Sequence, residues 1–295
     1  MDSKWFMRRM PRISLDSKLA SRVEACVSMN SFSYTILPGD SVERIAARFG
    51  VTAAAVFVAN TIREGGLIHP GEVLTIPGTE LAIDRSRRLP ADQFVGEKQP
   101  KDLIVLHFTA GGSVEGAYQS WLSTKERVAT AYLVDLDGHI YEVFHPAHWA
   151  CHLGVAAAHN PGFRQDKRSI GIEIVNWGGL KVDPGEHLNC WPKQYRTRYC
   201  GVSEKARYVG RSFRGLDYFA AFPEAQQAAV CQLTRSLCDQ FAIPKQIPLE
   251  AQRDRLDWSY YENYRGVASH QNFHAEKTDI GPAFDWERLS RVLAE

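Results

Sequence analysis

An apolar run that ends in a histidine constrains the fold of this chain most. The run LIVL at residues 103–106 leads directly to His107, and the loop-forming sequence FTAGG comes after it. A short apolar run bounded by turn residues predicts a buried β-strand that delivers its last side chain to a loop. A second such run, SIGIEIV at residues 169–175, carries Glu173. Because burying an unpaired carboxylate is costly, Glu173 is expected either to pair with a Lys or Arg of another strand or to have a chemical role.

A loop near the C-terminus carries an imidazole, an ammonium and a carboxylate. Its sequence is SHQNFHAEKTDIGP, at residues 269–282. Catalytic zinc commonly takes three protein ligands and leaves a fourth position for water, and imidazole nitrogen and carboxylate oxygen are both suitable donors. His107, His270 and Asp279 are therefore predicted to form a zinc site, with His274 as the rival of His270 in the same loop.

Glu173 and Lys277 would complete the chemistry of such a site. A carboxylate beside an activated water is suited to act as a general base. Lys277 lies shortly before Asp279, so its ammonium can reach the same pocket. There it would face the negative charge that develops on a carbonyl oxygen.

Three segments of the chain resemble a known enzyme family. HFTAGG, SIGIEIVNWG and SHQNFHAEKTDIGPAFDW are similar to segments of the zinc-dependent N-acetylmuramoyl-L-alanine amidases, whose fold is shared with phage amidase lysozymes and peptidoglycan recognition proteins. The resemblance covers about residues 95–295 and implies an α/β domain in which helices flank a mixed β-sheet. It implies Zn²⁺ as cofactor and, by the family's spacing, His107, His270 and Asp279 as its ligands.

The same resemblance assigns further roles. It implies Glu173 as the catalytic acid/base and Lys277 as the group on the oxyanion side. His152, in the sequence CHLG, is the best match to the family's Trp-His-Ala-Gly segment and is expected to line the cleft. The family's Ser-x-His-Tyr segment reads ATAY at residues 129–132, so the imidazole commonly found there is missing.

A second resemblance occupies the N-terminal third. Residues 33–78 resemble a LysM module, a small βααβ unit that binds glycans containing N-acetylglucosamine. The sequence YTIL at residues 34–37 predicts its first strand, and HPGEVLTIP at residues 69–77 predicts a turn and the returning strand.

The two helices of this module also have local signals. Apolar residues at i, i+3, i+4 and i+7 predict a helix that begins after Asp40 or Ser41 as N-cap and ends at Gly50. Thr52 is expected to cap a second short helix.

A length of 295 residues agrees with two modules at ~150 residues per domain. The segment after the LysM module is polar and mixed in charge, and it is expected to be a linker docked through Leu81 and Ile83. The predicted divisions are an N-terminal extension at 1–32, the LysM module at 33–78, the linker at 79–94, and the catalytic domain at 95–295 with insertions near 181–215 and 246–265.

The two insertions have different compositions. The first is basic, with aromatic residues between its charges. This composition suits either a surface that binds anionic polymers or a solvent-exposed segment whose charges keep it soluble. The second carries aromatic side chains that can wall the cleft: Trp258, Tyr260, Tyr261 and Tyr264.

The sequence allows one candidate disulfide but does not decide whether it forms. Cys231 and Cys238 share a face of a helix predicted from Pro223 to Phe241, so they are expected to be core thiols. Cys190 and Cys200 bracket part of the first insertion, where a disulfide would close a loop in an oxidising compartment.

Composition narrows the function classes. Hydrophobic residues make up 44% and charged residues 23%, which is typical of a globular chain. The net charge of +1 gives no indication of nucleic-acid binding. No apolar run approaches ~18 residues, so membrane insertion is not expected. No apolar stretch follows the basic N-terminus MDSKWFMRRMPR, so a secretory signal peptide is not expected.

Two functional hypotheses follow from these observations. The first is a peptidoglycan hydrolase that cleaves the amide between N-acetylmuramic acid and L-alanine of the stem peptide, with the glycan strand bound by LysM and the stem by the cleft. The second is a non-catalytic module that recognises muropeptides. The expected setting is synthesis in the cytoplasm and action in the periplasm or wall of a host or target cell. A phage endolysin or a secreted antibacterial effector, the latter with an immunity protein as partner, would fit, and a housekeeping hydrolase is third.

Overall fold

A computed structural model describes residues 32–49, 51–63, 65–77 and 81–295. Nearly all of the predicted N-terminal extension, including Cys26, lies outside the described residues, as does Gly50. The chain divides into two compact units, residues 1–80 and 81–295. None of the described helices has the length and apolar character needed to cross a bilayer.

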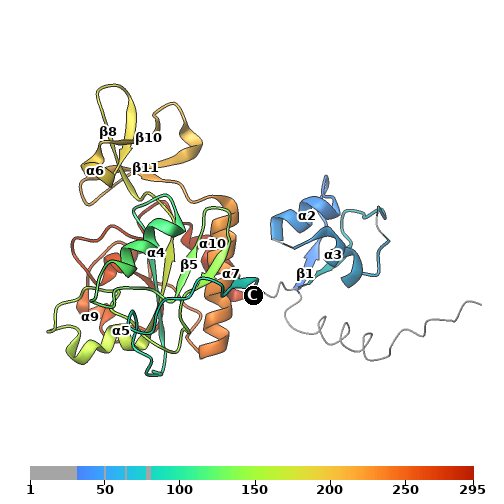
Figure 1. Ribbon diagram of the computed structural model, residues 1–295. Helices are drawn as coiled ribbons and strands as arrows, with labels where there is room; N and C mark the ends of the chain where they lie inside the picture. The colour runs from blue at the N-terminus through green and yellow to red at the C-terminus, as the bar shows by residue number, and fades with distance from the viewer. Residues whose placement is uncertain (1–31, 50, 64, 78–80) are drawn as a thin grey trace, which may run out of the picture. The chain divides into compact units, whose positions relative to one another are not determined.

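The first unit has the βααβ order expected for its sequence (Figure 1). Its elements are β1 (Phe32–Thr35), α2 (Val42–Phe49), α3 (Ala53–Ala59) and β2 (Val73–Ile76). The two strands pair antiparallel, and side chains of both helices join them in one small core.

Two hydroxyl groups begin the helices of this unit. The Ser41 hydroxyl accepts a hydrogen bond from the Arg44 amide, and the Thr52 hydroxyl accepts one from Ala55 at 3.1 Å. Asp40 instead accepts from the amide of Leu37. Ser41, not Asp40, therefore caps α2, and the predicted cap at Thr52 is confirmed.

The second unit is built on a mixed six-stranded sheet with the order β13-β4-β7-β5-β6-β3. Strands β13, β4, β7 and β5 run parallel, β5 and β6 run antiparallel, and β3 joins the edge parallel to β6. The strands are β3 (Ile83–Asp84), β4 (Leu103–Phe108), β5 (Tyr132–Val134), β6 (Ile140–Glu142), β7 (Ser169–Ile174) and β13 (Gly266–Ser269).

Helices complete this unit. The longest, α7 (Glu224–Phe241), packs on α10 (Trp286–Ala294), and both contribute to the main core together with Ile104 and Leu106 of β4. The shorter helices are α4 (Val114–Leu122), α5 (Arg164–Arg168), α6 (Pro192–Tyr195), α8 (Glu250–Arg253) and α9 (Trp258–Tyr261). The fold is therefore the expected mixed sheet with flanking helices.

The pleat of β4 determines where its histidine points. Leu103 and Val105 belong to a second core, on the face opposite to the main one. His107 follows them at the same two-residue spacing, and the register places it beside Glu173 of β7. Both reactive side chains thus lie at the carboxyl ends of neighbouring parallel strands.

The linker predicted over residues 79–94 is mostly part of the second unit. Leu81 and Ile83 pack against the main core, as the expected docking requires. The guanidinium of Arg88 donates to the buried carboxylate of Glu142 at 2.8 Å. The boundary between the units accordingly lies at residue 80.

The first predicted insertion folds with its flanking strands into a separate antiparallel sheet, seen at the top of Figure 1. Its order is β10-β9-β8-β12-β11. The strands are β8 (Gly179–Val182), β9 (His187–Cys190), β10 (Thr197–Gly201), β11 (Tyr208–Phe213) and β12 (Leu216–Ala220). We refer to these strands as the inserted sheet.

Cys190 and Cys200 are free thiols in the core of the inserted sheet. The register places Cys190 opposite Thr197 and Cys200 opposite Leu188, so the two cysteines do not face each other. The disulfide alternative is therefore wrong. The prediction of core thiols at Cys231 and Cys238 is confirmed, because both are buried in the main core.

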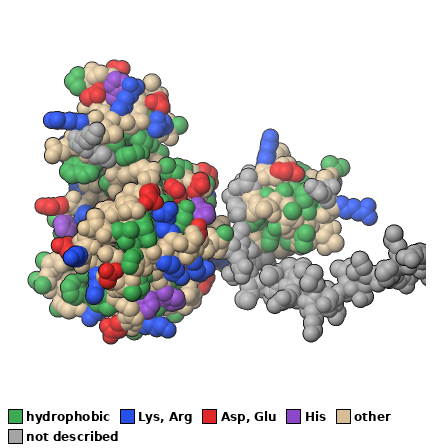
Figure 2. Space-filling model, in the orientation of Figure 1, with side chains coloured by type: hydrophobic (Ala, Val, Ile, Leu, Met, Phe, Trp, Pro, Cys, Tyr) green, Lys and Arg blue, Asp and Glu red, His purple; other side chains and the backbone are tan. Residues whose placement is uncertain are grey.

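Several cationic side chains of the inserted sheet and its connections have partners within the chain. Lys205 donates to the Tyr208 hydroxyl, Arg207 pairs with Glu204, and Arg211 pairs with Asp254. On the face in Figure 2, cationic and anionic side chains are intermixed over this sheet. These contacts favour the solvated alternative over a surface for anionic polymers.

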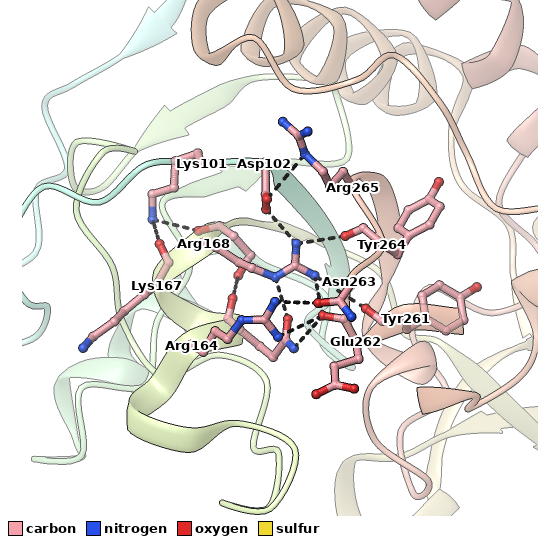
Figure 3. A network of polar contacts seen from close by, with 12 residues as sticks. Lys101, Asp102, Arg164, Lys167, Arg168, Tyr261, Glu262, Asn263, Tyr264 and Arg265 are labelled. Atoms are coloured by element: carbon pink, nitrogen blue, oxygen red, sulfur yellow. Dashed lines mark hydrogen bonds and ion pairs between the residues drawn. The ribbon is translucent and has the colours of Figure 1, made fainter. Parts of the chain in front are cut away.

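A polar network holds the second predicted insertion to the sheet (Figure 3). The Arg168 guanidinium donates to Asp102 at 2.6 Å and to the carbonyl of Tyr264 at 2.9 Å. The Lys101 ammonium donates to the carbonyls of Lys167 and Ser169. This network fixes the residues that precede β13 and so the start of the loop beyond it.

The aromatic residues of the second insertion pack inward. Tyr261 is fully buried, and Trp258, Tyr260 and Tyr264 pack around the same second core, beneath β4 and β13. They are not among the residues that line the cleft in the described part of the chain. The expectation that they wall the cleft is wrong, because they bury their apolar surface against the side chains of β4 and β13 in the second core.

Candidate functional site

Two histidines and one aspartate meet at the carboxyl ends of the parallel strands. His107 Nδ1 lies 2.9 Å from His270 Nδ1, and Asp279 Oδ2 lies 2.9 Å from His270 Nδ1 and 3.4 Å from His107 Nδ1. All three side chains are buried. The predicted residues thus form a compact donor cluster that could hold a metal ion.

Local structure delivers each member of this cluster. His107 lies near the end of β4, and β13 leads directly into a short 3-10 helix, His270–Asn272. The side chain of Asn272 accepts hydrogen bonds from the amide and hydroxyl of Ser269, which fixes the transition from strand to helix. The amide of Gln271 then donates to the carbonyl of Asp279 at 2.7 Å, which closes the loop on itself.

A chain of hydrogen bonds determines which nitrogen of His107 is free. The Ser169 hydroxyl donates to the Gln165 carbonyl at 2.7 Å, so it must accept from His152 Nε2 at 2.8 Å. His152 Nδ1 then carries no proton and accepts from His107 Nε2 at 2.9 Å. His107 Nδ1 is consequently left as a lone pair that points into the cluster.

His270 is oriented in the same way. Its Nε2–H donates to the carbonyl of Leu153 at 2.9 Å, so Nδ1 is the nitrogen that faces Asp279. Nδ1 of both imidazoles and one carboxylate oxygen therefore converge on a single point. With both Nδ1 atoms deprotonated this donor set would fit a cation, and the outer partners that orient the two rings are already in place.

Charge in the cluster agrees with this arrangement. Burial lowers the pKa of His107 to about 4, helped by the neighbouring His270 and opposed by Asp279. Burial works against ionisation of Asp279, but the charge and hydrogen bonds of His270 and His107 outweigh it and hold the pKa of Asp279 below its usual range. The site thus favours neutral His107 beside an ionised carboxylate, the protonation states that metal ligands need.

Glu173 stands beside the cluster. Burial and the nearby charge of Asp279 raise the pKa of Glu173 to about 8, and Lys277 acts in the opposite sense. The cation that acts on Glu173 is therefore a residue of the loop and not one of a neighbouring strand. A carboxyl group that changes its charge near neutral pH is suited to proton transfer.

The cluster lies at the base of a cleft of about 600 Å³. His152, Glu173 and Lys277 all line it, as the sequence predicted, and His274 lines it outside the donor cluster. Aromatic residues that the sequence did not single out form another part of the wall: Trp121, Trp177, Trp191 and Tyr195. Trp177 comes three residues after the end of β7, the strand of Glu173, and this position is the signal that could have identified it.

The fold and the cluster together define an α/β protein with a possible metal site, joined to a small βααβ module. Residues 97–282 match the N-acetylmuramoyl-L-alanine amidase family, and residues 34–77 match the LysM domain. Since the first match spans more than half of the chain, the protein belongs to the N-acetylmuramoyl-L-alanine amidase family. No match is found among curated proteins.

Solved structures with a similar arrangement include several amidases. AmiD from E. coli is 20% identical with a TM-score of 0.41, and the match covers 70% of this chain and 61% of the AmiD chain. A mutant endolysin from Bacillus subtilis is 14% identical with a TM-score of 0.41, covering 72% of this chain and 99% of that one. The amidase LysC from Clostridium intestinale URNW is 13% identical with a TM-score of 0.37, covering 72% and 97%.

Proposed function

We propose that the second unit is a zinc-dependent amidase that cleaves the amide between N-acetylmuramic acid and L-alanine of the peptidoglycan stem peptide. The observation that carries this proposal is the convergence of two imidazole Nδ1 atoms and a carboxylate beside Glu173 in an open cleft. Membership of the amidase family supports the reaction and the class of substrate.

His107, His270 and Asp279 would hold the metal. Two imidazoles and one carboxylate are a donor set that suits a catalytic zinc ion. When bound, zinc supplies Lewis acidity and makes water a nucleophile at neutral pH. The hydrogen bonds from His107 to His152 and from His270 to the Leu153 carbonyl hold both rings in the required orientation.

Glu173 and Lys277 would carry out the proton transfer and the charge stabilisation. Glu173 takes a proton from the attacking water and passes it to the nitrogen of L-alanine as the amide C–N bond breaks. The carbonyl oxygen gains negative charge during the attack, and the ammonium of Lys277 faces it from the loop.

Incubation of purified peptidoglycan with the full chain tests this function. We expect turbidity to fall and new alanine N-termini to appear, and a chelator to abolish both. Added Zn²⁺ should restore them, whereas Mg²⁺ should not, because Mg²⁺ prefers an octahedral set of oxygen ligands. Binding of peptidoglycan by the zinc-loaded protein without release of alanine N-termini would instead support the non-catalytic alternative.

The LysM module is proposed to hold the enzyme on polymeric glycan. Removal of residues 1–80 is expected to leave cleavage of soluble muropeptides near its original rate, because the whole of the second unit remains. Binding to insoluble sacculi should fall, since tethering can raise avidity by ~10²–10⁴-fold. Co-sedimentation with sacculi measures this loss, and equal sedimentation of both forms would contradict the tether.

We further propose that the protein acts on the cell wall of a host or target cell, as a phage endolysin or a secreted antibacterial effector. A polymer-binding module suits an enzyme of intact wall better than one of soluble fragments. Neighbouring genes distinguish these roles, because a holin gene would indicate an endolysin and an immunity gene an effector.

A further inference from the structure

We propose that Arg214 of the inserted sheet is a positioning residue for the loop that carries His270, Lys277 and Asp279. It lies in the hairpin between β11 and β12, far from this loop in sequence. The inserted sheet would then be a working part of the active site. The link to zinc chemistry rests on the proposed function, whereas the effect on loop order does not.

The guanidinium of Arg214 donates hydrogen bonds to three backbone carbonyl oxygens of the loop. Nη2 donates to Gln271 at 2.9 Å, and Nη1 donates to His274 at 2.9 Å and also to Lys277. Arginine presents five donors in a fixed planar fork, so one side chain can satisfy several acceptors at once. Carbonyls at the end of a short helix otherwise lack partners within that helix.

The rest of the loop is anchored elsewhere, which identifies the stretch that depends on Arg214. The Gln271 side chain donates to the carbonyl of Arg253 and accepts from the amide of Gly281. Between these anchors the bond from the Lys277 amide to the His274 carbonyl is long, at 3.3 Å. Arg214 therefore supports mainly the stretch 274–277, which presents Lys277 to the cleft.

The hairpin itself is built to place this side chain. Arg214 has a φ of 47° and Gly215 a φ of 77°, so both central residues adopt the left-handed conformation. This conformation suits a two-residue hairpin and is costly for arginine. Arg211, in the same hairpin, pairs with Asp254, whose carboxylate also accepts from Gln271. The inserted sheet thus contacts the loop directly and through Asp254, the residue after α8.

The test compares Arg214→Ala and Arg214→Lys with Arg207→Ala. Arg207 is a matched control because it lies in the 3-10 turn Lys205–Arg207 that leads into β11, and it bonds to Glu204 and stacks on Tyr199, away from the loop. Amide hydrogen exchange over residues 271–279 is measured in the metal-free full chain, and Zn²⁺ affinity is measured by competition with a chelator.

Arg214→Ala is expected to speed exchange of the loop by tenfold or more and to weaken Zn²⁺ binding by ~10–100-fold, as loss of an outer partner typically does. Arg214→Lys should be intermediate and Arg207→Ala unchanged. Unchanged exchange in Arg214→Ala, or an equal effect of Arg207→Ala, would overturn the proposal. If the wild-type chain bound no Zn²⁺, the proposed function would fail, but the exchange result would still decide the role of Arg214.

Discussion

Replacement of Glu173 by alanine is expected to lower kcat/KM on muropeptides by ~10²–10⁴-fold, the usual contribution of a general base. Zinc content should stay unchanged, because Glu173 lies beside the donor cluster and is not one of its members. The variant should also fold, since the side chain of Glu173 lines the cleft and is not part of the hydrophobic core. Steady-state kinetics together with metal analysis of the purified variant checks this result.

Glu276 provides the matched control for this substitution. It is a carboxylate that lines the same cleft but is exposed on the loop. Glu276→Gln should change kcat/KM only a few-fold, whereas Glu173→Gln should behave like Glu173→Ala. A rate above about a tenth of wild type in Glu173→Ala would remove Glu173 from the mechanism, and loss of zinc from that variant would identify it as a ligand.

The parts of the fold that the sequence predicted are those with strong local patterns. The apolar runs that become β4 and β7 are long enough and bounded clearly enough to be recognised as buried strands. The helix expected from Pro223 to Phe241 is observed as α7, Glu224–Phe241, because its apolar face repeats at the helical period. Thr52 could be identified as an N-cap from residue type and position alone.

The site could be predicted as a set of residue types, but its outer contacts could not. His107, His270 and Asp279 come together as expected. The hydrogen bond from His107 to His152 depends on the packing of β4 against a loop distant in sequence. Such tertiary contacts leave no periodic signal, so His152 could be placed only as a residue of the cleft.

The role of the inserted sheet could not be predicted from local sequence patterns. Its strands are short, with two register shifts, and its charges were compatible both with a surface for anionic polymers and with a solvated segment. Nothing local indicated that Arg214 would reach the carbonyls of a loop that follows β13. In the second insertion, the aromatic residues were equally compatible with a cleft wall and with a core, because either place buries their area.

The largest effect is expected from removal of a metal ligand, and the two loop histidines offer a direct comparison. His270→Ala should lower zinc content and activity together, and the loss of zinc affinity should exceed the ~10–100-fold typical of outer partners. His270 Nδ1 lies 2.9 Å from both His107 Nδ1 and Asp279 Oδ2, so its removal opens the cluster. Zinc per chain, measured by elemental analysis after dialysis, checks this outcome.

His274→Ala is the control within the same loop. The His274 ring lies in the cleft outside the donor cluster, with its centroid 6.2 Å from that of His270, and its Nδ1 accepts from the Glu276 amide. About one zinc ion per chain should therefore remain in this variant, as three protein ligands are still present. Its activity should change less than that of His270→Ala, through loss of a cleft contact alone. The reverse pattern, with zinc lost from His274→Ala and kept in His270→Ala, would assign the ligand to His274. The predicted position of the ligand in the loop would then be wrong by four residues.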